Sequence, residues 1–116
     1  MDFEDKRVCP RYEVSYKVSA TLDGRELGST IIDISEMGVG IMLSKNVSLG
    51  NMLEVDIEAD NDGKKKIINL RAMVVWVGKK NEDGMYRTGL EIIRISADDY
   101  EILTKNIQRL SKDDKE

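Results

Sequence analysis

Apolar and polar residues alternate along most of this chain, and this alternation constrains its fold more than any other feature. The clearest segment is 53–59, in which four apolar residues are separated by three acids: Leu53, Glu54, Val55, Asp56, Ile57, Glu58 and Ala59. Because successive side chains of a strand point to opposite faces, a period of two is typical of a strand with one face in a core. The acids are interpreted as a solvated face, since carboxylates on alternate positions diverge and supply too few ligands for calcium.

Turn signals divide the alternating segments into six predicted strands. Asp23-Gly24 and Asn61-Asp62-Gly63 are typical of hairpin turns. The predicted strands cover residues 12–22, 27–35, 39–43, 53–59, 67–77 and 86–95. In segment 67–77, one face is predicted to carry Leu70, Ala72, Val74 and Trp76. Trp76 is therefore interpreted as core or barrel-end packing in preference to a stacking surface for a ligand.

After residue 95 the period changes from that of a strand to that of a helix. Ser96 and Asp99 have the spacing of a capping box. Apolar residues then recur at helical spacing: Tyr100, Leu103, Ile107 and Leu110. This pattern predicts a helix over 96–110 with one buried stripe, followed by a solvated tail at 111–116. We expect the stripe to pack on the sheet of the same chain more often than on a second copy, which predicts a monomer or a weak dimer.

The resulting fold class is mainly all-β: a six-stranded antiparallel barrel with a C-terminal α-helix, preceded by a flexible N-terminal arm. Residues 1–11 form the arm because they lack periodicity, and residues 12–110 form the single domain. A barrel of this size is filled by its own side chains, so a ligand is expected on its outer wall.

Composition excludes several classes of function. The chain has 22 acidic and 18 basic residues and a net charge of −4, which argues against DNA or RNA as a partner because nucleic acids attract a basic surface. Histidine is absent and Cys9 is the only cysteine, which removes most zinc sites and the nucleophiles activated by histidine, so no enzyme activity is expected. The lack of a long apolar run predicts no membrane insertion, and the single cysteine fits the cytoplasm.

One polar cluster stands out from the strand pattern. Asp33, Ser35 and Gly38 lie at the end of the second predicted strand. If Ile32 and Ile34 face the core, then Ile31, Asp33 and Ser35 stand on the outer face, and Gly38 is free to take a positive φ or to let a ligand approach the backbone. A carboxylate and a hydroxyl beside open backbone suit the donor-rich Watson–Crick edge of guanine. An ordinary hairpin turn with two solvated polar residues is the alternative.

Two short motifs, in this order and on this strand pattern, give the chain a family resemblance. R-V-C-P-R at 7–11 has the form R-x-x-x-R, and D-I-S-E-M-G at 33–38 has the form D-x-S-x-x-G. V-V-W-V at 74–77 precedes a last strand that carries G-L-E-I at 89–92. Over residues 6–110 the chain resembles a PilZ domain, the bacterial receptor module for cyclic di-GMP. That resemblance also implies a six-stranded barrel with a flanking helix.

The resemblance implies roles for individual residues. Arg7 and Arg11 match the arginines that grip the phosphates and stack on or bond to the guanines, which suits the planar, charged fork of arginine. Asp33 and Ser35 match the residues that bond a guanine edge and hold the arm, and Gly38 matches the glycine that leaves room for the base. Two further residues, Lys6 and Trp76, are weaker candidates for contact with the ligand; the position of Lys6 is linked to how many ligands bind.

The function expected from this resemblance is that of a receptor without catalysis or a cofactor. Cyclic di-GMP binds, changes the conformation of the N-terminal arm, and the chain signals to an unidentified downstream effector protein in motility, biofilm formation or a related output. The alternative is a PilZ-like protein–protein interaction module of pilus or motility machinery that binds no nucleotide. The sequence leaves open whether one or two ligands bind.

Overall fold

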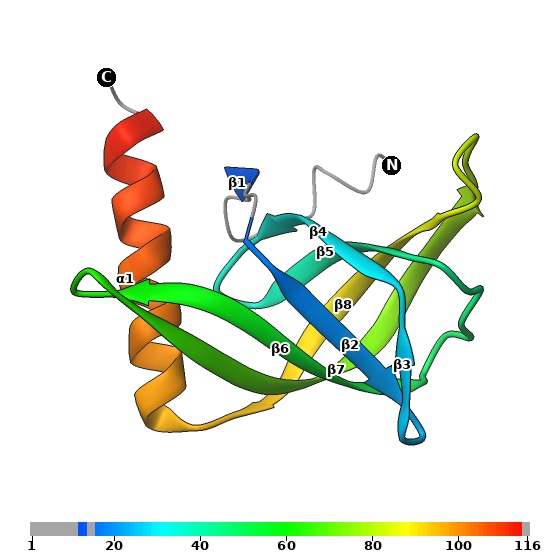
Figure 1. The fold of residues 1–116 in the computed structure, drawn as a ribbon, viewed down its shortest axis with the longest axis horizontal. Coiled ribbons are helices and arrows are strands. Elements are labelled where there is room, and N and C mark those ends of the chain that lie inside the picture. Colours follow the sequence, from blue (N-terminus) through cyan, green and yellow to red (C-terminus); the bar gives the residue numbers. More distant parts are fainter. Residues whose placement is uncertain (1–11, 14–15, 115–116) are drawn as a thin grey trace.

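Eight antiparallel strands form one sheet that curls into a nearly closed barrel, and a single helix follows them (Figure 1). The computed structural model describes residues 12–13 and 16–114. The elements are β1 (Tyr12–Glu13), β2 (Val18–Leu22), β3 (Arg25–Leu27), β4 (Ser29–Ile34), β5 (Gly38–Leu43), β6 (Met52–Asn61), β7 (Lys64–Lys80), β8 (Tyr86–Ile95) and α1 (Ala97–Asp114). Neighbouring strands in the sheet follow the order β1-β4-β5-β8-β7-β6-β2-β3.

The core is built from the inward positions of the alternating strands, as the sequence predicted. Leu53, Val55 and Ile57 are fully buried, and each contributes roughly 1.5–3 kcal/mol by leaving water. The acids between them face outward toward β7. Glu54 lies 3.8 Å from Arg71, Asp56 accepts a hydrogen bond from the Asn69 amide at 2.7 Å, and Glu58 lies 3.0 Å from Lys65. The acidic face of β6 is thus paired with polar and basic groups of the next strand.

The expected count of six strands is wrong because two of the predicted strands are each divided. Segment 12–22 contains β1 and β2, and segment 27–35 contains the end of β3 and all of β4. The second division lies at Gly28, whose N–H donates to Ser44 Oγ at 2.9 Å and whose carbonyl accepts from Ser44 N at 2.8 Å. β3 pairs with β2 and β4 pairs with β5. The chain therefore turns a corner of the barrel there without losing its alternation.

Irregularities in the strand pairing change which way side chains point. Ile31 faces Ile41 and Asp33 faces Gly40, which leaves one extra residue in β4. The prediction that Ile31 shares the outer face is therefore wrong, because this bulge lets both Ile31 and Ile34 enter the core. A second bulge lies between Val74 and Trp76 in β7. Trp76 was expected in the core or packed at the barrel end, and the core position is wrong, since the bulge turns it outward and leaves it 43% exposed.

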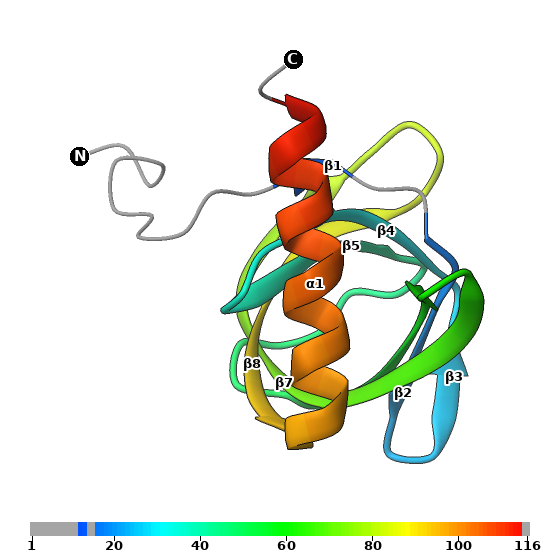
Figure 2. The same ribbon diagram turned by 90° about the vertical axis from the view of Figure 1, so that its left-hand side faces the viewer.

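Helix α1 crosses one end of the barrel and closes it (Figure 2). Its first turn is capped as predicted, with Ser96 Oγ accepting from Asp99 N at 3.1 Å. Leu103 and Ile107 are buried as expected, but Tyr100 is 39% exposed, so its place in the buried stripe is wrong. The helix continues to Asp114, into the segment predicted as tail. In the described part of the chain, no helix has the length and apolar character needed to cross a membrane.

A buried amide fixes the helix to the barrel. Asn106 is 2% exposed, and its Nδ2 donates to the Asp60 carbonyl at 2.8 Å and to the Ile102 carbonyl at 2.7 Å. Its Oδ1 accepts from the Tyr16 hydroxyl at 3.0 Å. One polar side chain of α1 therefore joins the strand β6 to the segment that precedes β2, and its buried polar atoms are satisfied.

Candidate functional site

Four residues on adjacent strands form one row across the outer wall of the barrel. Asp33 in β4 faces Gly40 in β5, Gly40 faces Gly89 in β8, and Gly89 faces Trp76 in β7. The neighbours of the two glycines in their strands, Val39, Ile41 and Leu90, are in the core. The open side of each glycine therefore faces outward. Strands are spaced about 4.8 Å apart, so the row is roughly 14 Å long.

The two glycines make room for the two side chains at the ends of the row. A Cβ on Gly40 would lie 2.5 Å from Asp33 Oδ1, which is far inside contact distance. A Cβ on Gly89 would lie 3.4 Å from the Trp76 Cβ, and one on Gly78 would lie 3.0 Å from Trp76 Cη2. The carboxylate thus folds over Gly40, and the indole lies across Gly89 and Gly78. We call the surface made by Gly40 and Gly89 the glycine shelf.

Asp33 is held in this position by a cation that the sequence analysis did not single out. Arg87 Nη2 lies 3.6 Å from Asp33 Oδ2, and the Asp33 side chain is only 10% exposed, whereas that of Arg87 is 53% exposed. Arg87 is two residues before Gly89 in β8, so both lie on the same face. The outer wall therefore presents a positive group beside the buried carboxylate.

Ser35 builds the turn that follows Asp33. Its Oγ accepts from Gly38 N at 3.1 Å and from Met37 N at 3.3 Å, and it donates to the Gly38 carbonyl at 3.2 Å. The residue is 2% exposed, so the expectation of a solvated serine on the outer face is wrong. The hydroxyl is directed into the turn because it satisfies two backbone N–H groups there.

Gly38 begins β5 opposite Glu91 and is buried. In the described part of the chain, the glycines with positive φ are Gly24, Gly50, Gly63 and Gly84. Of the two alternatives expected for Gly38, the positive φ is therefore wrong, and the approach of a ligand to its backbone stays a prediction. Together with Ser35, Gly38 shapes the tight turn from β4 to β5, and the D-x-S-x-x-G segment is thus a turn that places one carboxylate on the sheet.

The N-terminal candidates Lys6, Arg7 and Arg11 lie outside the described residues. The described chain joins the sheet immediately after them. In β1, Tyr12 pairs with Ile34 and Glu13 pairs with Asp33. The sequence thus enters the barrel one residue after Arg11, at the edge where Asp33 begins the row.

This arrangement suits a flat heteroaromatic group. Trp76 offers an aromatic face at one end of the row and Asp33 offers a hydrogen-bond acceptor at the other, and the two glycines lie beneath these side chains. A planar ring with N–H donors on its edge satisfies both. Among the described residues, no three potential metal ligands come together.

Comparison with known proteins identifies the family. The family model described as the PilZ domain matches residues 5–109, which is nearly the whole chain. The chain belongs to the PilZ domain family. The resemblance carried by the two motifs is confirmed, and the mostly β barrel with one C-terminal helix agrees with a PilZ fold, although its strand count is higher than we expected.

Solved PilZ structures share this fold at low sequence identity. The PilZ domain with c-di-GMP of YcgR from Escherichia coli has a TM-score of 0.70 and 14% identity, with 93% of each chain covered. The Bacillus subtilis inhibitor of motility MotI/DgrA has a TM-score of 0.73 and 21% identity, with 90% of this chain and 50% of that chain covered. The K. pneumonia MrkH–c-di-GMP complex has a TM-score of 0.69 and 17% identity, with 95% and 54% covered.

This PilZ chain therefore spans about half the length of the MotI/DgrA and MrkH chains. No curated protein matches the sequence significantly.

Three residues in or beside the row were not predicted from the sequence. Gly40, Gly89 and Arg87 belong to the site through strand pairing. The segments G-V-G at 38–40 and R-T-G-L at 87–90 contain the signal, because a glycine between core residues of a strand often marks a close approach. The register that aligns those glycines is not visible in either segment alone.

Proposed function

We propose that this PilZ domain is a receptor for cyclic di-GMP and that the ligand binds over the glycine shelf. The observation that carries the proposal is the row from Asp33 to Trp76, which lies beside β1, whose first residue Tyr12 follows the R-x-x-x-R segment in the sequence. The YcgR PilZ domain and MrkH, both similar in fold to this chain, were solved with the same ligand, and the family match brings that ligand to this chain as the leading candidate.

Charge sets the orientation of the ligand on the shelf. Cyclic di-GMP carries two phosphate charges, which the Asp33 carboxylate repels, so a guanine edge faces Asp33 and the phosphates face cations. Arg7 and Arg11 supply the cations in this proposal, since arginine binds phosphate oxygens in pairs and stacks on bases. Ser35 and Gly38 act by holding the turn, and Lys6 contributes charge at the edge of the site.

Trp76 and Arg87 contribute to the proposed site in addition to the residues of the two motifs. The indole stacks on a base, which is worth about 1–3 kcal/mol per base when such an aromatic is replaced by alanine. Arg87 competes with the ligand for Asp33, because a base N–H and the guanidinium approach the same carboxylate. Binding then frees Arg87 to turn toward a phosphate while the base takes over the carboxylate.

The biological role follows from the ligand bridging two parts of the chain. Cyclic di-GMP links the R-x-x-x-R segment to the row, shifts the population of arm conformations, and the new arrangement is read by a downstream effector protein in motility, biofilm formation or a related output. The chain acts as a monomer or a weak dimer, without catalysis, a cofactor or nucleic acid. The alternative remains a PilZ interaction module that binds no nucleotide.

Isothermal titration with cyclic di-GMP tests the proposal. Wild type is expected to bind, and Trp76→Ala is expected to weaken binding by roughly 5- to 150-fold, the equivalent of one lost stacking contact. Arg7→Ala is expected to weaken it by roughly 10- to 100-fold, since a charge-assisted hydrogen bond contributes about 1.5–3 kcal/mol.

Ile67→Ala is the matched control, because Ile67 lies in the same strand as Trp76, is 54% exposed and faces Glu58 away from the row. A wild-type chain that ignores cyclic di-GMP at micromolar concentration supports the interaction module instead. Binding that survives Trp76→Ala unchanged moves the site off the row.

A further inference from the structure

An exposed apolar groove runs along the end of β8, next to the turn that carries the D-x-S-x-x-G segment. It encloses about 380 Å³ between that turn, β8 and the first turn of α1. Met37, Ile93 and Tyr100 line it and are 51%, 49% and 39% exposed. Ile93 points outward because Ile92 pairs with Ala72 and Arg94 pairs with Arg71, which leaves Ile93 as the extra residue of a bulge.

The groove carries opposite charges at its two ends. Glu36 and Glu91 line the end near the turn, and Glu91 pairs with Gly38 there. Arg94 lines the other end, three residues and about 10 Å farther along β8. Among the described residues, neither glutamate has a cation within 4 Å, and Arg94 has no acid within that distance.

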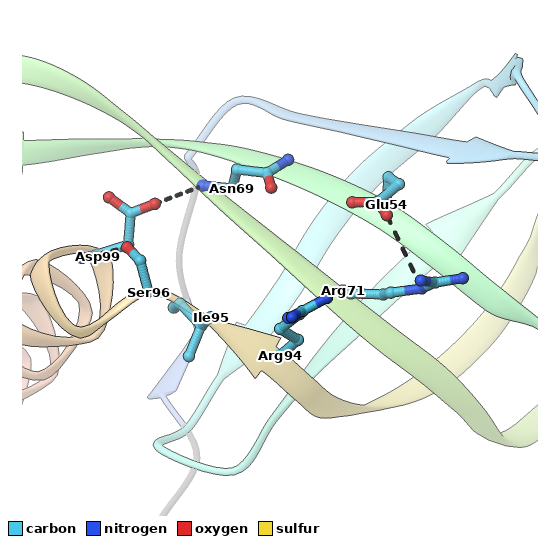
Figure 3. A pocket seen from close by; sticks show the side chains of 7 residues that line it. All are labelled: Glu54, Asn69, Arg71, Arg94, Ile95, Ser96 and Asp99. Carbon is cyan, nitrogen blue, oxygen red and sulfur yellow. Dashed lines mark hydrogen bonds and ion pairs between the residues drawn. The ribbon is translucent and has the colours of Figure 1, made fainter.

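A second arginine strengthens the positive end. Arg71 pairs directly with Arg94, and both line a pocket beside the first turn of α1, in which the Arg71 side chain points toward Glu54 (Figure 3). Arg71 lies 3.8 Å from Glu54, and Asp99 lines the same pocket as the two arginines. Like charges directly opposite each other on a sheet destabilise it, so an acidic group placed between them gains from both arginines.

We propose that this groove binds an amphipathic segment of a partner protein. The apolar face of the segment packs on Met37, Ile93 and Tyr100. A basic residue at one end of the segment faces Glu36 and Glu91, and an acidic residue at the other end faces Arg94. This supplies the contact through which the proposed receptor reaches its effector, so its role rests on the proposed function.

The size of the groove favours a short segment over a second copy of the chain. Three half-exposed apolar side chains offer on the order of 300 Å² of contact surface, whereas each partner in a stable interface buries about 800 Å². The buried face of α1 is already occupied by the barrel, since Ile102, Leu103 and Ile107 lie in the core. The described part of this chain therefore has no exposed helix stripe that fills the groove of another copy.

A displayed peptide library provides the probe. Twelve-residue peptides carry leucine along one helical face and randomised Lys or Glu at both ends, and they are selected on the immobilised full chain. We expect enrichment of peptides with Lys at one end and Glu at the other. Ile93→Ser is expected to weaken the selected peptides by tenfold or more, while Ile67→Ser, a change of the same type at an exposed site on β7, leaves them bound.

Charge reversal gives the decisive comparison. With Arg94→Glu, the enriched pool is expected to replace the terminal Glu by Lys at the end that faces residue 94. Equal enrichment of all charge orders, or an unchanged order on Arg94→Glu, overturns the proposal. The proposal is also overturned if sedimentation shows that wild type forms a dimer and that Ile93→Ser abolishes it, because the groove is then filled by a second copy.

Two cross-checks separate this inference from the nucleotide site. Ile93→Ser is expected to bind cyclic di-GMP as wild type does, and Trp76→Ala is expected to bind the selected peptide as wild type does. A chain that binds the peptide but no nucleotide refutes the receptor and keeps the groove. A chain that binds nucleotide but enriches no peptide refutes the groove alone. Thermal unfolding of each variant establishes that it is folded.

Discussion

The two glycines of the shelf give a paired prediction in which stability and binding respond differently. A methyl group on Gly40 would lie 2.5 Å from Asp33 Oδ1, about 0.9 Å inside the 3.4 Å at which ordinary contact begins. Asp33 must therefore swing away from the shelf in Gly40→Ala. A methyl group on Gly89 would lie 3.4 Å from Trp76 Cβ, which is an ordinary contact. The free protein therefore accommodates Gly89→Ala.

The cost of Gly40→Ala is worked from the parts of Asp33 that move. An off-rotamer carboxylate costs about 0.5–1.5 kcal/mol, and loosening a partly exposed ion pair with Arg87 costs up to about 1 kcal/mol. The loss of glycine freedom in the unfolded chain offsets about 0.4–1 kcal/mol of this. We expect a net loss of about 1 kcal/mol, which lowers Tm by roughly 4 °C in a domain of this size. For Gly89→Ala we expect an unchanged or slightly raised Tm.

Both variants are expected to bind cyclic di-GMP less tightly. Gly40→Ala withdraws the acceptor of a charge-assisted hydrogen bond, which corresponds to a loss of roughly 10- to 100-fold. In Gly89→Ala the methyl group lies against the Trp76 indole that we propose to stack on the base, and we expect a loss of at least about tenfold, the equivalent of 1.4 kcal/mol. Thermal unfolding by circular dichroism and isothermal titration measure the two effects. Wild-type affinity in Gly89→Ala refutes the row as the ligand site, and a Gly40→Ala variant with wild-type affinity refutes the role of Asp33.

Two further predictions concern parts of the fold that support the site. Ser35→Ala removes a buried hydroxyl that pairs with the N–H groups of Met37 and Gly38, and we expect it to lower the free energy of unfolding in urea by about 1–3 kcal/mol; a loss below about 0.5 kcal/mol contradicts a structural role for this serine. Burial raises the pKa of the Tyr16 phenol, the negative charge of Asp60 adds to this increase, and Arg109 acts in the opposite direction. Because the unfolded tyrosine then ionises near pH 10 before the folded one does, stability falls as the pH rises above 10. Tyr16→Phe is expected to lack this component in urea unfolding measured from pH 8 to 11, and parallel pH curves for the two proteins would rule it out.

The sequence was most informative where one strand face is simply buried. The alternation at 53–59 places Leu53, Val55 and Ile57 in the core, and the bounds of β8 agree with the predicted strand. These predictions succeed because burial of one face requires a period of two, and a slip of one residue would expose the whole face. The N-terminal cap of α1 is equally local, since Ser96 and Asp99 are three residues apart and bond directly.

The sequence failed where an extra residue enters a strand. The bulges near Ile31 and Val74 are set by pairing with strands distant in the chain, and they reverse the expected direction of Ile31 and Trp76. The pattern of apolar and polar residues does not show where an extra residue is inserted, because the residues on both sides of the insertion are apolar with or without it. The pairing of Arg87 with Asp33 was invisible for the same reason, since it needs the register of β4, β5 and β8 together.

The turn from β4 to β5 connects the two surfaces that we propose to bind partners. On one side it follows Asp33, which begins the row. On the other side Met37 lines the groove, and its carbonyl accepts a hydrogen bond from Ile92 N at 2.9 Å, so the turn is fixed directly to β8. The three hydrogen bonds of the Ser35 hydroxyl make this turn a rigid unit. A ligand that moves Asp33 therefore acts on the same turn that shapes the groove. The row and the groove are coupled through this turn, without a more extended path through the barrel.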